Sequence, residues 1–246
     1  MLHISIKAEP IFRVYGFPVT NTILLSAAVF VFFVALALFY SFQIRREEKN
    51  RLFYLIHFGL NFIYGLFRSV FEDKINYFFP LLGTFFFFIL LNNWSGLIPG
   101  VGTLLVKTSE SRHETLVPLL RGGTADLNTT LALALITVVF SQYIGIKTLG
   151  FFAYIKRFVN FKSPMAFFTG IIETVSEFSK IVSFSFRLFG NIFAGEVIIA
   201  IMAFLIPVLI SFPFLLFEIF IGFIQAIVFS MLSAVFYNLA MQKADH

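Results

Sequence analysis

The longest apolar run of this sequence, residues 167–206, carries an arginine near its middle. The run has the residue pattern of a helix, and at 1.5 Å per residue its roughly 40 residues would span about 60 Å. The hydrocarbon core of a bilayer is only about 30 Å thick, so such a helix must be strongly tilted, bent or split. An arginine cannot lose its proton to lower the cost of burial. Arg187 should therefore face protein or trapped water rather than lipid, and we expect it to be functional.

Five polar side chains share one face of this expected helix. With an advance of about 100° per residue they form a stripe about 80° wide, and most of the remaining helix surface is apolar. The five residues are Glu173, Glu177, Lys180, Arg187 and Asn191. Glu196 lies on a different face, so we expect one ionic surface for a partner and a carboxylate directed elsewhere. For the end near Glu177, a structural ion-pair ladder within the bundle is the alternative.

The composition indicates that such runs cross a membrane. Of 246 residues, 59% are hydrophobic and only 13% are charged, about half the charged fraction of a soluble domain. Several stretches of about 18 or more nearly uncharged residues predict an all-α polytopic membrane protein. The expected spans follow one another closely, so we interpret residues 1–246 as a single membrane domain.

Several kinds of site are missing from this sequence. It has no cysteine, which excludes disulfides and thiolate metal sites. Its four histidines are scattered without metal-ligand spacing, so we expect neither a metal nor a cofactor. The net charge of +5 lies in loops, which argues against nucleic acid as a partner. The sequence also lacks a phosphate-binding glycine loop and a nucleophile motif, so we expect no chemistry from the isolated chain.

The apolar segments predict about five membrane segments. Three of these spans are expected within residues 22–146. They cover about 22–42, 77–98 and 129–146. Two longer runs follow, at 167–206 and 213–239, and Pro207 and Pro213 mark the turn region between them.

Residues 52–72 are less hydrophobic than these spans. Polar side chains recur there at three-to-four spacing against Leu, Phe and Ile. They are His57, Asn61, Tyr64 and Arg68. We interpret the segment as an amphipathic helix that lies at the membrane surface or packs on the bundle. A poor transmembrane span is the alternative.

Positive charges in the loops predict the orientation of the chain. Residues 43–51 contain four basic side chains, and residues 147–162 contain four more. The positive-inside rule makes both loops cytoplasmic, or matrix-facing in a mitochondrion. Residues 1–21 should then form an external N-terminal segment, and the C-terminus should be cytoplasmic.

Two further carboxylates stand at informative helix positions. Asp126, or Asn128 beside it, can cap the third span and offset the positive N-terminal end of its dipole. In the last apolar run, Glu218, Gly222 and Gln225 share one face. A carboxylate and an amide therefore line one side of an otherwise apolar helix.

Three short motifs carry a family resemblance. Arg-Leu-Phe-Gly-Asn at 187–191, followed by Ala-Gly-Glu at 194–196, resembles the signature of subunit a of rotary F-type ATP synthases. This subunit is the ion-channel stator beside the c-ring. Leu-x-Asn-x-x-Gly-Leu-Ile-Pro-Gly at 91–100 and Thr-Ala-Asp-Leu-Asn at 124–128 resemble two further blocks of that family. The resemblance implies that residues 167–240 form a hairpin of two long tilted helices that lines the ring interface.

The resemblance also implies roles for residues near this interface. Arg187 would be the essential stator arginine, which attracts a deprotonated ring carboxylate and keeps two offset half-channels separate. Lysine would be a poor substitute because it can lose its proton when it is desolvated. Asn191 can orient the guanidinium, and Gln225 is expected to form a hydrogen bond toward Arg187.

The remaining polar candidates would line the two half-channels. Glu196 and Glu218 are candidates for the external one, and Asp126 would lie near its entry if it does more than cap a helix. Family members often have histidine at one of the two glutamate positions, so the order of proton transfer between them stays open. Glu173, Glu177 and Lys180 could line the cytoplasmic exit, although a role in ion pairing explains them equally well.

The resemblance further implies partners and a location. The partners would be the c-ring, a b-type peripheral stalk and membrane lipid, in a hetero-oligomeric complex that couples proton flow to ATP synthesis. Glu196 after Ala-Gly favours a bacterial plasma membrane over a mitochondrial inner membrane. Two alternatives remain at this stage: a stand-alone secondary transporter or ion channel with Arg187 as an anion-binding residue, and a membrane scaffold held by ion pairs.

Overall fold

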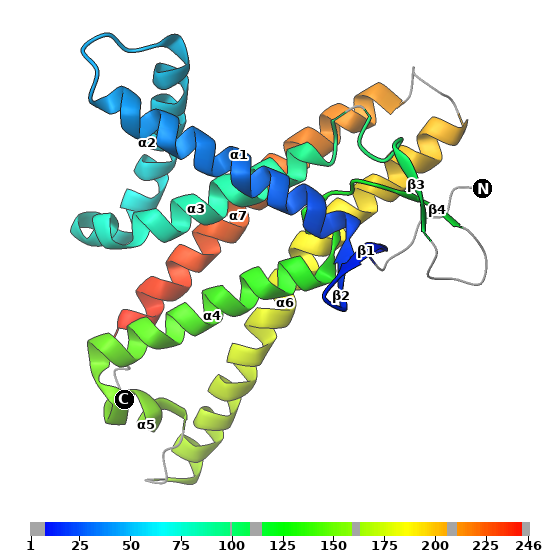
Figure 1. Ribbon diagram of the computed structural model, residues 1–246. Helices are drawn as coiled ribbons and strands as arrows, with labels where there is room; N and C mark the ends of the chain where they lie inside the picture. Colours follow the sequence, from blue (N-terminus) through cyan, green and yellow to red (C-terminus); the bar gives the residue numbers. More distant parts are fainter. Residues whose placement is uncertain (1–7, 99, 109–114, 159–162, 206–210, 243–246) are drawn as a thin grey trace.

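The computed structural model describes residues 8–98, 100–108, 115–158, 163–205 and 211–242 (Figure 1). Within these residues the chain is almost entirely helical. The α-helices are α1 (Asn21–Ile44), α2 (Arg51–Phe71), α3 (Ile75–Ser95), α4 (Leu127–Leu149), α5 (Phe151–Phe158), α6 (Pro164–Leu205) and α7 (Ser211–Met241). The short elements are strands β1 (Pro10–Val14), β2 (Phe17–Thr20), β3 (Leu105–Thr108) and β4 (Thr115–Pro118), and 3-10 turns at Glu72–Lys74 and Gly123–Ala125.

Five helical segments are long and apolar enough to cross a membrane. They are Asn21–Ile44, Arg51–Ser95, Leu127–Leu149, Pro164–Leu205 and Phe212–Met241. The second segment joins α2 and α3 through a single 3-10 turn. The all-α polytopic membrane fold predicted from the sequence is therefore confirmed, with each expected span inside one of these segments or differing from it by a few residues.

Helix α2 is amphipathic and packs on the bundle. Its buried residues Phe53, Ile63 and Phe67 lie on one face, and the helix contacts α3 and α7. His57 is exposed beside Phe53, with the two rings stacked at a centroid distance of 5.6 Å, and its ring Nδ1 lies 2.9 Å from the hydroxyl of Tyr40 on α1. The chain reverses direction at Glu72, whose φ of 49° is a left-handed conformation that non-glycine residues seldom adopt. This reversal sends α3 back through the centre of the fold.

The C-terminal hairpin consists of α6 and α7, which pack against each other. Helix α6 runs without a break over 42 residues. The sequence left three ways for this segment to fit a bilayer: tilted, bent or split into two helices. The structure excludes the split. Pro213 does not end a helix. It stands in the first turn of α7, where a missing N–H leaves no hydrogen bond unmade. The predicted turn at Pro207 lies outside the described residues, as do the first seven and last four residues of the chain.

The core lies where α3, α4, α6 and α7 meet. Its fully buried side chains include Leu82 and Ile89 on α3, Leu188 on α6 and Tyr237 on α7. Phenylalanine rings fill much of the space between them through edge-to-face contacts. The Phe184 and Phe229 rings, for example, lie 5.0 Å apart at 78°. Such pairs add to the stabilisation from buried area.

Two antiparallel hairpins, β1–β2 and β3–β4, lie at the end of the bundle where α1 begins (Figure 1). The sequence predicted residues 1–21 only as an external N-terminal segment and predicted no strand in either region, so these strands are an addition. Strands of four or five residues have little apolar alternation to reveal them, and their pairing depends on the partner strand. The ends of α4 and α7 lie at the opposite end of the bundle (Figure 1).

Candidate functional site

Arg187 lies on the outer face of α6. Its side chain is exposed, and Nη2 donates a hydrogen bond of 3.2 Å to Ser183 Oγ, one turn earlier on the same helix. Between positions 180 and 194 the other exposed residues of α6 are uncharged. They are Val182, Ser183, Phe186, Asn191 and Ala194. Within the described residues no carboxylate forms an ion pair with Arg187.

The expected hydrogen bond from Gln225 to Arg187 is not formed. Gln225 is half-buried on α7, whereas the guanidinium is held along the outer surface of α6 by Ser183. A helical wheel places residues around each helix but does not set the rotation of one helix against the other. The wheel alone could therefore not establish whether Gln225 reaches Arg187.

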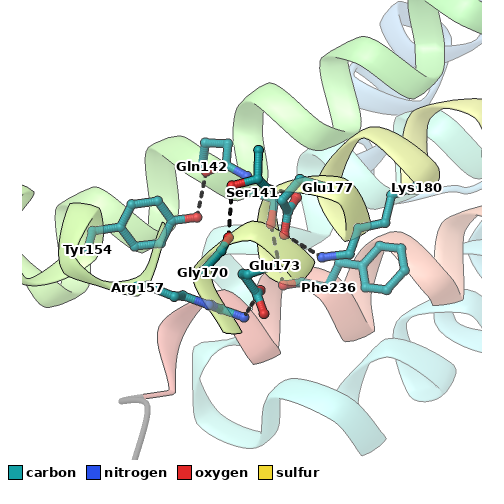
Figure 2. A network of polar contacts seen from close by, with 10 residues as sticks. Ser141, Gln142, Tyr154, Arg157, Gly170, Glu173, Glu177, Lys180 and Phe236 are labelled. Atoms are coloured by element: carbon teal, nitrogen blue, oxygen red, sulfur yellow. Dashed lines mark hydrogen bonds and ion pairs between the residues drawn. The ribbon is translucent and has the colours of Figure 1, made fainter. Parts of the chain in front are cut away.

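The polar stripe of α6 divides into two parts, which corrects the expectation of one continuous ionic surface. Its first half packs under α4 and α5 and is paired inside the protein (Figure 2). Arg157 on α5 forms an ion pair with Glu173, and Lys180 forms one with Glu177. The Lys180 ammonium also lies 4.7 Å from the ring centroid of Phe236 on α7. This geometry favours the ion-pair interpretation for these three stripe residues, while Arg187 and Asn191 remain exposed.

A glutamine and a tyrosine complete the surroundings of Glu177. Gln142 Nε2 donates to Glu177 Oε2 at 2.9 Å, and the Tyr154 hydroxyl donates to Gln142 Oε1 at 2.6 Å (Figure 2). Burial, and then the nearby charge of Glu177, raise the pKa of Tyr154 to about 12. The phenol therefore stays protonated at physiological pH and keeps donating, which turns the amide N–H of Gln142 toward the carboxylate. Gly145 makes room for this ring, because an added Cβ there would overlap it.

Two carboxylates lie close together where α6 and α7 face each other. Glu218 on α7 is 3% exposed, and its Oε1 has no hydrogen-bond partner among the described residues. Its carboxyl packs directly over the Cα of Gly195 on α6, so a Cβ at Gly195 would overlap it. The neighbouring residue, Glu196, forms an ion pair with Arg121, with 3.2 Å between Oε2 and Nε. Arg121 was not among the predicted site residues.

A cavity of about 460 Å³ opens beside Glu196. Its walls come from the loop after α3, from the segment before α4, and from α6. Its lining residues include Glu9, Arg121, Gly122, Glu196, Ile199 and Ala200. The cavity thus connects the surface at the β-hairpin end of the bundle to the Glu196 carboxylate, one residue from the Gly195 contact of Glu218.

A buried polar cluster supports this region from the side of α3. Asn93 Nδ2 donates to the carbonyl of Gly222 at 2.8 Å, and the Thr124 hydroxyl donates to Asn93 Oδ1 at 2.7 Å. The Ser26 hydroxyl on α1 donates to Asn92 Oδ1 at 3.0 Å. Asn92, Asn93 and Thr124 lie within two of the family motifs, but they were not among the predicted site residues. The signal that could have found them is the presence of two adjacent amides inside an apolar span.

Asp126 is the N-cap of α4, as predicted for one of its two interpretations. Its Oδ1 accepts from the backbone N–H of Asn128 at 3.0 Å, and its Oδ2 accepts from the Thr22 hydroxyl at 3.1 Å. It is 6% exposed and does not line the cavity. We therefore assign Asp126 to the cap, which also ties α4 to the start of α1.

Replacing Asp126 by alanine should lower the free energy of unfolding by about 1–2 kcal/mol, because the helix loses its cap and Thr22 loses its acceptor. Denaturant titration of the detergent-solubilised protein measures this change. Asp126→Asn keeps an oxygen acceptor and should retain most of the stability. Asn128→Ala is the comparison variant: it removes the 3.2 Å hydrogen bond from Asn128 Nδ2 to Asp126 Oδ1 but leaves the backbone cap, so it should lower stability less. Equal stability losses in Asp126→Ala and Asn128→Ala would contradict the capping role.

Comparison with known proteins identifies the family. The sequence profile described as ATP synthase A chain matches residues 22–238. The chain is 35% identical to the "ATP synthase subunit a, sodium ion specific" of Propionigenium modestum over 236 residues, covering 95% of this chain and 78% of the relative. It is 35% identical to ATP synthase subunit a of Gloeobacter violaceus, covering 76% and 71% of the two chains, and 34% identical to that of Moorella thermoacetica, covering 73% and 72%. The chain belongs to the ATP synthase A chain family.

The resemblance inferred from three short motifs is thus confirmed, and its extent is larger than expected. The family match begins at residue 22 and includes α1 and α2, which resembled subunit a only by their topology. As a member of the subunit a family with five membrane-length helices, the chain is a multi-pass membrane protein. Among the described residues, no group of three or more His, Cys, Asp or Glu side chains is placed to hold a metal ion.

Proposed function

We propose that this chain is the proton-translocating stator subunit in the membrane sector of an F-type ATP synthase. In this role Arg187 faces the carboxylates of a rotating c-ring, and two offset half-channels lead to that interface. The single observation that supports this most is that Arg187 is exposed on α6, where the other exposed residues between positions 180 and 194 are uncharged. An arginine that met lipid there would cost about 3 kcal/mol or more, so an anionic partner should cover it in the assembled complex.

The permanent charge of Arg187 explains how ion flow is coupled to rotation. One elementary charge that crosses 100 mV releases about 2.3 kcal/mol, and a continuous pore would dissipate this energy. A ring carboxylate that reaches Arg187 is attracted only when it is deprotonated. A protonated ring carboxyl is neutral and is not attracted to Arg187, so it must exchange its proton through a half-channel. Arg187 thereby acts as the barrier between the two half-channels.

The external half-channel would follow the cavity beside Glu196. Its opening, the Glu196 carboxylate and the buried Glu218 carboxyl form a sequence from the surface to the α6–α7 contact. Carboxyl groups can accept and release protons at such positions. On the cytoplasmic side, the exit would pass the second cluster of titratable groups, formed by Glu173, Glu177 and Lys180.

The remaining proposals concern orientation and assembly. From the positive-inside rule we propose that the ends of α1 and α4 and the C-terminus lie in the cytoplasm and the β-hairpin end of the bundle lies outside. We assign the chain to a bacterial plasma membrane, with the mitochondrial inner membrane as the alternative. A c-ring against the Arg187 face and a b-type peripheral stalk elsewhere would complete its protein contacts.

We propose that the transported ion is the proton. The relative from P. modestum is named sodium ion specific, so the choice of ion needs a test. In sodium-free buffer, a protonophore should collapse the ion gradient that the complex builds.

Affinity purification from mild detergent tests the proposed function. The tagged chain should bring down an oligomeric small hydrophobic ring protein together with soluble ATPase subunits, and the preparation should hydrolyse ATP. A tagged multi-pass transporter from the same membranes is the control and should bring down neither. Isolation of this chain alone or as a homo-oligomer would contradict the stator proposal and favour a stand-alone transporter.

A further inference from the structure

Arg121 and Glu196 form an ion pair in the wall of the cavity. Arg121 lies in the segment before α4, and its Nε is 3.2 Å from Glu196 Oε2. The side chains are 12% and 24% exposed, so the pair is largely shielded from solvent. The guanidinium carbon also lies 5.8 Å from the ring centroid of Phe193, on the face of α6 that carries Glu196. A cation and an aromatic ring at this distance attract each other, which fixes the position of Arg121.

The backbone beside Arg121 follows the same carboxylate closely. A Cβ built on Gly122 would lie 3.2 Å from Glu196 Oε1, closer than such atoms normally approach. Gly122 also packs on Gly96, whose built Cβ would lie 3.1 Å from the Gly122 Cα. Two glycines therefore let the loop after α3 and the segment before α4 approach each other, and this approach brings Arg121 to Glu196. The ion pair is a consequence of the fold at this point and not of a freely rotating surface side chain.

Glu218 has the opposite surroundings. It is 3% exposed, lies over Gly195, and forms no ion pair within the described residues. Its Oε1 has no hydrogen-bond partner there either. Burying a charge without a balancing group is far more costly than burying a neutral carboxyl. A charge on Glu196 is balanced by Arg121, whereas a charge on Glu218 has no balancing cation.

We propose that Arg121 is a positioning residue of the external half-channel, an inference that rests on the proposed function. By pairing with Glu196 it holds that carboxylate as a fixed anion and leaves Glu218 as the carboxyl that takes up and releases the transported proton. During synthesis the proton passes from cavity water to a Glu218 oxygen and then to a ring carboxylate, and during pumping it returns by the same route. Among the described residues, the charged or titratable groups near Glu196 are Arg121 from the loop, Glu218 from α7 and Glu9, which lines the same cavity.

ATP-driven pumping in inverted membrane vesicles tests this proposal. Four variants are compared with wild type: Arg121→Gln, Arg121→Lys, Glu196→Gln and the double variant Arg121→Gln/Glu196→Gln. Each rate is divided by the amount of assembled complex, measured by co-purification of the ATPase subunits. Arg68→Gln, an exposed arginine on α2, is the matched control and should pump like wild type.

Arg121→Gln removes the cation and keeps the Glu196 carboxylate. It should reduce pumping per assembled complex by about tenfold, because the buried Glu196 then lacks its ion-pair partner. Arg121→Lys should restore most of the rate, since an ammonium also neutralises Glu196. The double variant should pump no worse than Glu196→Gln alone, because Arg121 acts through that carboxylate. Such non-additivity is the signature of two groups that act as one unit.

Two results would overturn the inference. One is a wild-type rate per assembled complex in Arg121→Gln, even if less complex assembles, because Arg121 would then only stabilise the loop. The other is a double variant whose loss equals the product of the two single losses. Both results leave the stator proposal intact if Arg187→Ala abolishes pumping in the same vesicles. Normal pumping by Arg187→Ala would instead overturn the stator proposal and this inference with it.

Discussion

Replacing Arg187 by alanine is expected to abolish ATP-driven pumping, with a loss of at least about 100-fold, while the complex stays assembled. The side chain is exposed on α6, and within the described part of the chain its only hydrogen bond is to Ser183, so we expect the fold to tolerate its removal. Its proposed partner is a carboxylate on another subunit. Alanine removes the charge that this carboxylate must meet, and with it the barrier between the half-channels.

The experiment records ATP-driven pumping, and then passive proton leak after the soluble ATPase has been stripped from the membranes. A retained or increased leak in Arg187→Ala would support the role of Arg187 as the barrier. Arg187→Lys should fail to restore pumping, because a desolvated ammonium can lose its proton and a guanidinium cannot. Arg68→Ala, on an exposed face of α2, serves as the control for loss of a basic side chain. Pumping near the wild-type rate in assembled Arg187→Ala complexes would refute the stator role of this residue.

Replacing Gly195 by alanine is the second change with a large expected effect. Alanine inside a helix normally stabilises it by up to about 1 kcal/mol relative to glycine. At this position the added Cβ would overlap the carboxyl of Glu218, so this buried side chain would have to move. Relieving the overlap should cost about 1–3 kcal/mol and displace Glu218 from the α6–α7 contact. We therefore expect a loss of pumping of about tenfold or more together with a lower unfolding temperature.

Gly65→Ala provides the matched control, because a Cβ at Gly65 on α2 would meet nothing within 4 Å. It should leave pumping unchanged and leave the unfolding temperature equal or slightly higher. The combination Gly195→Ala/Glu218→Asp shortens the displaced side chain by one methylene and should recover part of the lost stability. If Gly195→Ala behaves like Gly65→Ala in both measurements, the close packing of Glu218 on Gly195 does not control the proton path.

Most of the helical architecture was predictable because its signals are local. Apolar length located the spans, and the amphipathic spacing of residues 52–72 located α2. The carboxylate at Asp126 predicted a helix cap that the structure confirms. These signals need only neighbouring residues and the thickness of a bilayer. The β-hairpins escaped prediction because strands this short are defined by their pairing partner and not by their own sequence.

The candidate site was predicted less completely, for the same reason. The motif around residue 187 is local, and it was sufficient to select Arg187, Asn191 and Glu196 as candidates. The wheel placed Glu177 on one stripe with Arg187, although α4 covers the one and leaves the other exposed. A wheel describes one helix at a time, so it contains no information on where neighbouring helices begin and end.

The sequence by itself determined that this chain is a polytopic helical membrane protein of the subunit a family and that a permanent charge lies in its longest helix. Composition, span length and three motifs carry this information without any contact between distant residues. Only the tertiary structure decided how the charges are paired. Arg121 reaches Glu196 across 75 positions of sequence, and Gln142 reaches Glu177 across 35. Glu218 packs on Gly195, and among the described residues its Oε1 has no hydrogen-bond partner. Which charges are neutralised depends on how helices and loops pack, and glycines at 122 and 195 set that packing by permitting close approach.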